Sequence, residues 1–220
     1  PIQNIGAYGA ELADVLVRVA TIEMAGGEPV EFDRAACRFG YRESVFKEAG
    51  RGRFFITTVT LRLAKNAAPK VDYADLNRVL AEAGITSPTI RDACAAVETI
   101  RRAKLPDPAV LGNAGSFFKN PEIDAAHHAR LKERHPAIPG YPARDKVKVP
   151  AAWLIEQCGW KGKRLGHVSC HERQPLVIVN HGGATGAEIL AHAERVITSV
   201  LERFEIRLKP EVNIIGDAAT

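Results

Sequence analysis

The residues best suited to chemistry lie in the ten-residue segment Gly112–Pro121, with the sequence GNAGSFFKNP. Its two glycines permit tight turns and a close approach of a ligand to the backbone just before Ser116. Lys119 and Asn120 place a cation and an amide nearby. The pattern differs from the GxSxG elbow of a nucleophilic serine, from a P-loop and from a dinucleotide-binding GxGxxG. From the residues alone it indicates either a ligand-binding loop or a glycine turn that leads into a core strand.

Other polar residues point to an anionic small molecule. Arg42 follows Tyr41 in a glycine-flanked connector, and a guanidinium binds a carboxylate through two hydrogen bonds, although most arginines are simply solvated. Glu211 lies in an otherwise apolar segment, where it is either outward-facing and inert or turned into a cleft. Tyr73 and Lys104 suit a phosphate-bearing ligand. These residue types predict a binding site for an anionic ligand, but they do not specify a reaction.

Composition limits the class of protein. The chain has 220 residues, of which 46% are hydrophobic and 25% charged, with a net charge of +4. These values are typical of one large or two small globular domains, and they exclude a disordered tail or a nucleic-acid-binding arm. No stretch approaches the roughly 18 apolar residues of a membrane span. The only methionine is Met24, and the first residues lack the basic and apolar regions of a secretory signal.

The four cysteines argue against a disulfide scaffold, because they are few and widely spaced. The densest group of possible metal ligands is Cys158, His167, Cys170, His171 and His181. Structural zinc sites normally present two closely spaced ligand pairs, and this group offers only one pair of direct neighbours. We therefore expect no metal and a reduced, cytoplasmic protein.

In the first half of the chain, periodicity predicts strands over 15–24 and 53–63. In the second strand, five alternate residues are expected to share one face: Phe55, Thr57, Val59, Leu61 and Leu63. A helix follows, with Ser87-Pro88 as its start and the two prolines of 105–108 as its end. This end is the first expected domain boundary.

The second half contains more helix and loop, and the class is α+β with two subregions. We expect, in order, a helix over 123–134, an exposed loop over 137–149, a helix over 150–158, a buried strand over 176–179, a long helix after the capping box Thr185-x-x-Glu188 and a strand over 206–215.

Six segments occur in an order that identifies a family. They are PIQNIGAYG at 1–9, CRFGYR at 37–42, KLPDP at 104–108, GNAGSFFKNP at 112–121, AAWLIEQCGWKG at 151–162 and KPEVNIIG at 209–216. Over its whole length the chain closely resembles the UDP-N-acetylenolpyruvoylglucosamine reductases (UDP-N-acetylmuramate dehydrogenases). The region around Tyr73 is similar to the longer form of this family, which places a tyrosine loop over the substrate.

The resemblance implies a fold and cofactors. Residues 1–105 would be part of a vanillyl-alcohol-oxidase-type FAD-binding domain, and residues 106–206 a separate α+β substrate-binding domain. Residues 207–220 would be a strand that returns to the first domain. The cofactors implied are FAD and NADPH, and five residues match backbone that lines the flavin ring: Ile5, Gly6, Ala7, Tyr8 and Gly9.

The resemblance also implies roles for single residues. Ser116 matches the proton donor, and Arg42 and Glu211 match the other two catalytic positions. Five residues match positions that hold the UDP-sugar: Tyr41, Tyr73, Lys104, Asn120 and Gln174. The implied reaction is the reduction of UDP-N-acetylglucosamine enolpyruvate to UDP-N-acetylmuramate, in which Arg42 stabilises the developing charge and Ser116 delivers a proton.

One departure from the family pattern concerns the start of the chain. Family members begin with a glycine-rich FAD-binding segment that has no counterpart here, so we expect this polypeptide alone to bind FAD poorly and to be inactive without that segment as a partner. We expect a monomer with no nucleic-acid or membrane partner. Two alternatives stay open, namely another flavoprotein oxidase of the same fold and a UDP-sugar-binding protein without turnover.

Overall fold

The computed structural model describes residues 2–216, and the chain divides into two units, residues 1–101 and 102–220. This division lies four residues before the boundary expected from the prolines. Both units combine helices with antiparallel strands, which confirms the α+β class. Among the described residues, no helix has the length and apolar character needed to cross a membrane.

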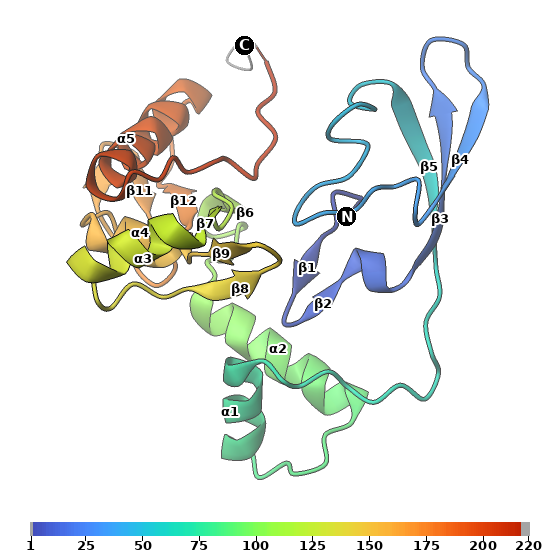
Figure 1. Ribbon diagram of the computed structural model, residues 1–220, viewed down its shortest axis with the longest axis horizontal. Coiled ribbons are helices and arrows are strands. Elements are labelled where there is room, and N and C mark those ends of the chain that lie inside the picture. Colours follow the sequence, from blue (N-terminus) through green and yellow to red (C-terminus); the bar gives the residue numbers. More distant parts are fainter. Residues whose placement is uncertain (1, 217–220) are drawn as a thin grey trace. The chain divides into compact units, whose positions relative to one another are not determined.

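Unit 1 contains a three-stranded antiparallel sheet in the order β4 (Pro29–Asp33), β3 (Leu16–Glu23) and β5 (Phe54–Leu61). Figure 1 shows β3 between the other two strands. β3 and β5 confirm the two strands predicted over 15–24 and 53–63. A small apolar cluster packs with this sheet, formed by Leu12, Leu16, Val19 and Cys37.

The face predicted for the second strand is wrong, because β5 contains an irregularity at Thr57. The register pairs Val59 with Val19 and Phe55 with Ile22, and it shifts by one residue in between. Val19 and Ile22 lie on opposite faces of β3, so Val59 and Phe55 are also on opposite faces. Alternation of residue types does not reveal such a bulge.

Two helices follow the sheet and pack against each other (Figure 1), and all but the last three residues of the second belong to unit 1. They are α1 (Ala74–Glu82), which the sequence patterns did not predict, and α2 (Ile90–Lys104), which they did. Their contact is formed by Leu76, Leu80, Ala96 and Ile100. α2 begins one residue after Thr89, whose hydroxyl and amide both bond to the Asp92 carboxylate. Thr89 therefore caps the helix, and the expectation for Ser87 is wrong.

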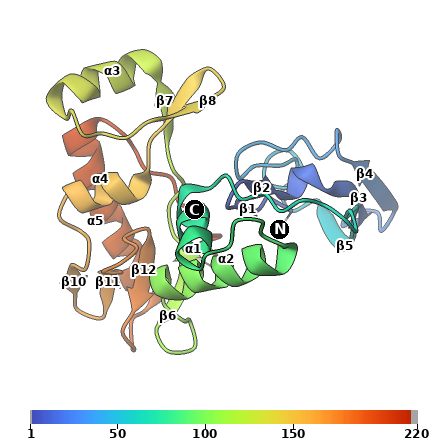
Figure 2. The same cartoon turned by 90° about the horizontal axis from the view of Figure 1, so that it is seen from below.

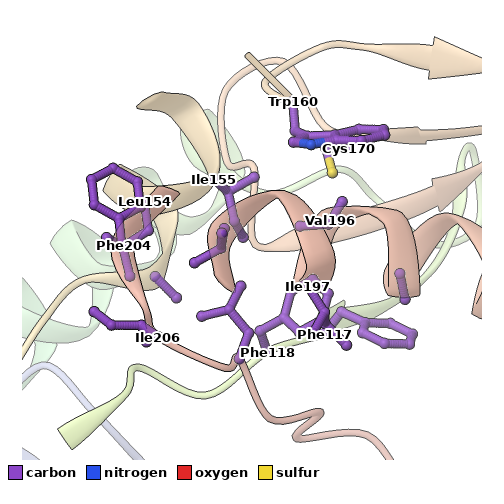
Figure 3. Close-up of a cluster of buried hydrophobic side chains, with 14 of the residues drawn as sticks. Phe117, Phe118, Leu154, Ile155, Trp160, Cys170, Val196, Ile197, Phe204 and Ile206 are labelled. Atoms are coloured by element: carbon purple, nitrogen blue, oxygen red, sulfur yellow. The ribbon is translucent and has the colours of Figure 1, made fainter. Parts of the chain in front are cut away.

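Unit 2 is built around α5 (Gly186–Phe204), which packs on a sheet in the order β10 (Arg164–Leu165), β11 (Val168–Cys170), β12 (Val177–Asn180) and β6 (Gly112–Ser116). The predicted Thr185–Glu188 capping box is confirmed. Figure 3 shows the buried side chains around α5, among them Val196, Ile197 and Phe204. A single continuous core holds this unit together.

A second sheet in unit 2 has the order β7 (Glu122–Asp124), β9 (Lys146–Lys148) and β8 (Tyr141–Ala143). The loop expected over 137–149 is therefore wrong, because this segment carries a hairpin. The helices predicted on either side are confirmed as α3 (Ala125–Arg134) and α4 (Ala151–Gln157), both visible in Figure 2.

The strand expected over 206–215 is absent from that range. The segment is extended, and Pro210 forms one isolated bridge with Phe118. It belongs to unit 2, and the part of the 207–220 prediction that falls on 217–220 lies outside the described residues.

All four cysteines are free thiols, with Cys37 and Cys170 buried in the two units. Within residues 2–216, no group of three or more His, Cys, Asp or Glu side chains is placed to hold a metal ion.

Candidate functional site

Ser116 ends strand β6 and pairs with Val177 of β12. The next residue, Phe117, donates its amide to the carbonyl of Leu176 at 2.7 Å. Phe117 and Phe118 are both buried, with their rings in an edge-to-face contact, whereas Ser116 is exposed. The phenylalanine pair therefore fixes the end of the strand in the core and leaves the serine hydroxyl at the surface.

Glu211 lies beside this strand end. Its amide donates to the Phe117 carbonyl at 2.8 Å, and the Lys119 amide donates to the Lys209 carbonyl at 2.9 Å. Because these bonds flank the bridge between Phe118 and Pro210, the two segments run antiparallel. The half-buried Glu211 is thus held opposite the residue that follows Ser116, and the fold brings together two residues separated by 95 positions in the sequence.

Gln174 lies at the same end of the sheet. Its carbonyl accepts the amide of Val177, the strand partner of Ser116, and its own amide donates to Nδ1 of His171 at 3.3 Å. The side-chain oxygen of Gln174 is buried and has no hydrogen-bond partner among the described residues. Burial lowers the pKa of His171, with a further contribution from Arg173, so the imidazole is kept neutral and able to accept this bond.

Of the two other predicted substrate residues of unit 2, one ends a helix and the other lies between β6 and β7. Lys104 is the last residue of α2 and is half-buried. Asn120 accepts the Ala151 amide on its side-chain oxygen at 2.9 Å, and it thereby satisfies a backbone donor at the start of α4. Asn120 therefore has a structural role in addition to any contact with a ligand.

In unit 1, Arg42 lies against the predicted flavin-lining backbone. Its guanidinium donates to the Asn4 carbonyl at 3.3 Å and to the Gly6 carbonyl. It also lies 3.7 Å from the Glu11 carboxylate and 5.0 Å from the centre of the Tyr41 ring. The backbone of Arg42 is left-handed, with φ of 56°. These contacts hold one cationic group over the segment Ile5–Gly9.

Asn4 organises this arrangement. It is 2% exposed and left-handed, a conformation that asparagine tolerates better than most residues. Its side-chain nitrogen donates to the Glu11 carboxylate at 2.8 Å and to the Gly40 carbonyl at 2.9 Å, and its oxygen accepts the Ala13 amide at 3.0 Å. Asn4 thus joins the segment 5–9 to the connector that carries Arg42.

The segment Ile5–Gly9 forms most of a hairpin between β1 (Gly6–Ala7) and β2 (Ala10–Glu11). A Cβ atom added to Gly6 would lie 2.7 Å from Cγ of Glu11 and 2.9 Å from the Ala10 carbonyl oxygen, so this position requires glycine. The turn passes through left-handed Tyr8, whose ring meets the Tyr73 ring edge-on at 5.3 Å. Two predicted ligand-binding tyrosines are therefore in contact.

The predicted residues are shared between the two units. Unit 1 carries Ile5–Gly9, Tyr41, Arg42 and Tyr73, and unit 2 carries Lys104, Ser116, Asn120, Gln174 and Glu211. Sequence reasoning missed four residues that hold them: Asn4, Glu11, Asn113 and His171. A signal existed for Asn113, since it lies between the glycines of the most informative segment, but the sequence did not show its bonding partners.

Comparison with known proteins identifies relatives of this chain. The family model described as "UDP-N-acetylenolpyruvoylglucosamine reductase, C-terminal domain" matches residues 107–215. UDP-N-acetylenolpyruvoylglucosamine reductases from Burkholderia pseudomallei (strain 1710b) and Burkholderia mallei (strain NCTC 10229) are 55% and 54% identical over 214 residues. The alignments include 96% of this chain but only 61% and 62% of those proteins.

The fold also matches a solved structure. The crystal structure of UDP-N-acetylenolpyruvylglucosamine reductase from Thermus caldophilus aligns with a TM-score of 0.59 and 23% identity, over 96% of this chain and 57% of that one. At this identity the similarity concerns the fold alone. Taken with the family model and the Burkholderia relatives, these findings show that the chain belongs to the UDP-N-acetylenolpyruvoylglucosamine reductase family, of whose members it spans about three fifths.

Proposed function

We propose that the chain carries out the reduction of UDP-N-acetylglucosamine enolpyruvate to UDP-N-acetylmuramate, as part of an NADPH-dependent flavoenzyme in peptidoglycan precursor synthesis. Because the chain spans 61% of its curated relatives, the activity is proposed for the complete natural protein that contains it. That protein would supply the FAD-phosphate-binding segment missing from these residues. The proposal includes action as a monomer in the cytoplasm.

One observation carries the proposal. The amide of Glu211 is bonded to the carbonyl of Phe117, so a carboxyl group and the Ser116 hydroxyl occupy neighbouring backbone positions at one sheet edge. Among the described residues, no histidine or lysine base is hydrogen-bonded to the Ser116 hydroxyl, so its environment suits a proton donor better than a nucleophile.

In the proposed mechanism, each polar side chain has a separate task. Arg42, fixed by two backbone carbonyls and Glu11, would stabilise negative charge on the substrate carboxylate as the enolate forms. Glu211, in its protonated form, would donate a hydrogen bond to the same carboxylate, and Ser116 would deliver a proton to C2 as general acid. The two buried phenylalanines that follow Ser116 anchor the backbone next to it in the core.

The geometry of unit 1 fits a flavin ring. Ile5, Ala7 and Gly9 are exposed along the β1–β2 hairpin, so this backbone is open to a ligand. Ile5–Gly9 would therefore hold the ring through backbone contacts. When bound, FAD supplies the redox chemistry, transferring reducing equivalents from NADPH to the enolpyruvyl group.

The substrate class is proposed from the family resemblance, and the cationic Lys104 is consistent with it. Lys104 would contact the diphosphate, Asn120 and Gln174 would bind the nucleotide-sugar, and Tyr41 and Tyr73 would be further contacts of the UDP-sugar. The buried, unpartnered oxygen of Gln174 supports this assignment, since a ligand hydroxyl or amide would satisfy it.

The proposal is tested by Ser116→Ala in the complete natural protein. We expect turnover of the UDP-sugar with NADPH to fall about 10²–10⁴-fold, while binding of the UDP-sugar is retained. The matched control is Ser199→Ala on α5, where the hydroxyl donates to the Arg195 carbonyl at 2.9 Å. Equal turnover in both variants would refute the proton-donor role. An unmodified protein that binds the UDP-sugar without oxidising NADPH would instead support the non-catalytic alternative.

A further inference from the structure

Asn113 connects two segments of the candidate site. It lies in β6, three residues before Ser116 and nine after Lys104. Its side-chain nitrogen donates to the Leu111 carbonyl at 2.8 Å and to the Pro106 carbonyl at 3.3 Å, and its side-chain oxygen accepts the Gly115 amide at 3.0 Å. One amide therefore bonds to backbone on both sides of its own position, using both donors and its oxygen.

The bond to Gly115 restricts the residue just before Ser116. Gly115 has a φ of +74°, and a Cβ atom placed there would meet no other atom within 4 Å. The backbone conformation, not lack of space, therefore requires glycine at this position. Glycine is also the most flexible residue, so a fixed direction for Ser116 needs an external constraint, which the Asn113 oxygen provides.

The bond to Pro106 restricts the segment that follows Lys104. Within this segment, Asp107 accepts the amides of Val110 and Leu111 on its carbonyl at 3.0 and 2.8 Å, and forms a compact turn. The Asn113 nitrogen ties the residue before that turn to β6. Lys104 lies two residues earlier, where α2 ends.

We propose that Asn113 is a positioning residue that sets the direction of Ser116 through Gly115 and the location of Lys104 through Pro106. The inference rests on the proposed function, because it assigns a purpose to the geometry of those two residues. The two polar atoms of the side-chain amide have separate roles. The oxygen fixes Gly115 and thereby orients the proton donor, and the nitrogen holds the segment that binds the UDP-sugar.

The chemistry of the amide allows these tasks to be separated by substitution. Asn113→Ala removes both. Asn113→Asp keeps an acceptor for the Gly115 amide but loses the donor, and its carboxylate repels the carbonyls of Pro106 and Leu111. The matched control is Asn180→Ala on the adjacent strand, where the side chain likewise accepts the amides of Gly182 and Ala184 and donates to the Ala184 carbonyl.

Steady-state kinetics in the complete natural protein should separate the variants. For Asn113→Ala we expect kcat to fall about 10–100-fold and KM for the UDP-sugar to rise about 10-fold, as positioning losses of this size are common. For Asn113→Asp we expect the rise in KM with kcat within about 3-fold of the unmodified protein. Asn180→Ala should change neither value by more than about 2-fold. The solvent deuterium isotope effect on kcat should increase only in Asn113→Ala, because only there is proton delivery slowed.

Hydrogen exchange gives a readout that does not depend on turnover. The amides of residues 105, 107, 109–111 and 115–116 should exchange faster in Asn113→Ala than in Asn180→Ala, while those of α5 remain protected in both. The inference is overturned if Asn113→Ala matches Asn180→Ala in kinetics and exchange, or if Asn113→Asp behaves as Asn113→Ala does. If the unmodified protein shows no reductase activity, the proposed function fails, and the exchange data alone then decide whether Asn113 positions the two segments.

Discussion

The two units hold their site residues by different means. In unit 2, Ser116 and Glu211 are placed by a strand end whose phenylalanines are buried in a continuous core. In unit 1, Arg42 is placed by hydrogen bonds and an ion pair, and the apolar residues form two smaller clusters, one against the sheet and one between α1 and α2. Hydrophobic burial therefore positions the predicted site residues of unit 2, and a polar network around the buried Asn4 positions Arg42 in unit 1.

This difference predicts how each half responds to mutation. A packed core loses stability in proportion to the volume removed, whereas a polar network loses most when a partner is left buried and unsatisfied. Four predictions, in decreasing order of expected effect, test whether the units differ in this way. Hydrogen exchange followed by mass spectrometry measures amide protection separately in the peptides of each unit.

The largest effect is expected for Phe204→Ala in unit 2. Phe204 is fully buried and contacts the rings of His135 and Trp153. Its truncation should lower the free energy of unfolding by about 3–5 kcal/mol, measured by urea denaturation. Leu201→Ala on the same helix, where the side chain is 37% exposed, is the control and should cost clearly less. Equal losses would show that the core is not organised around this face of α5.

A pH effect of the next size is expected from His192, also in unit 2. Burial lowers its pKa to about 4, with smaller contributions from Arg195 and Lys163. The unfolded chain, with an ordinary pKa of about 6.5, binds more protons between these values, so stability is highest above pH 6.5 and falls by up to about 3 kcal/mol towards pH 4. Urea melts at several pH values measure this loss. His192→Leu should flatten the profile, and an unchanged slope would exclude His192 as its source.

In unit 1, Asn4→Ala should cost about 2 kcal/mol, because the Glu11 carboxylate and the Ala13 amide lose a buried partner. We expect faster exchange in the peptides around Gly6 and Arg42, with α5 unaffected. Asn66→Ala, at an exposed position of the same unit, is the control. If residues 5–9 exchange at the same rate in Asn4→Ala as in the Asn66→Ala control, the polar network does not stabilise unit 1.

The smallest effects are expected at the two helix caps, one in each unit. Thr89→Ala and Thr185→Ala each remove a hydroxyl that bonds at a helix start, and each should cost about 1 kcal/mol. The first should accelerate exchange at the start of α2, and the second at the start of α5. Serine at either position should restore protection. A loss that serine does not restore would point to the threonine methyl group instead of the cap.

Long periodic segments were predictable from the sequence. α5 combines an apolar stripe with a complete capping box, and β3 is a run of β-branched and apolar residues between turn signals. Shorter elements were not predictable. The hairpin of β8 and β9 consists of three-residue strands with Pro142 inside one of them, and such strands carry too few residues to show a period.

The sequence patterns did not predict the bulge of β5 or the bridge at Pro210, and the reason is different. Each depends on a partner strand far away in the sequence, Ala20–Thr21 for the first and Phe118 for the second. Local patterns contain no information on such registers.

The candidate site likewise has parts that the sequence predicts and parts that it does not. Its motifs were recognisable, and the fold places Ser116, Glu211 and Gln174 at one end of a sheet. The supporting residues were not recognisable. Asn4 and Asn113 look like ordinary turn asparagines until their partners are known, because glycine-rich turns commonly contain asparagine.

The buried cysteines allow the opening of each unit to be measured by thiol labelling. Cys37 lies in the sheet cluster of unit 1, Cys170 in the core of unit 2, and burial raises their thiol pKa values to about 11 and about 12. A thiol reagent therefore reaches each of them only when its unit opens, while the exposed Cys94 reacts at once. The labelling rates of these thiols thus time the opening of each unit within one polypeptide, without any introduced probe.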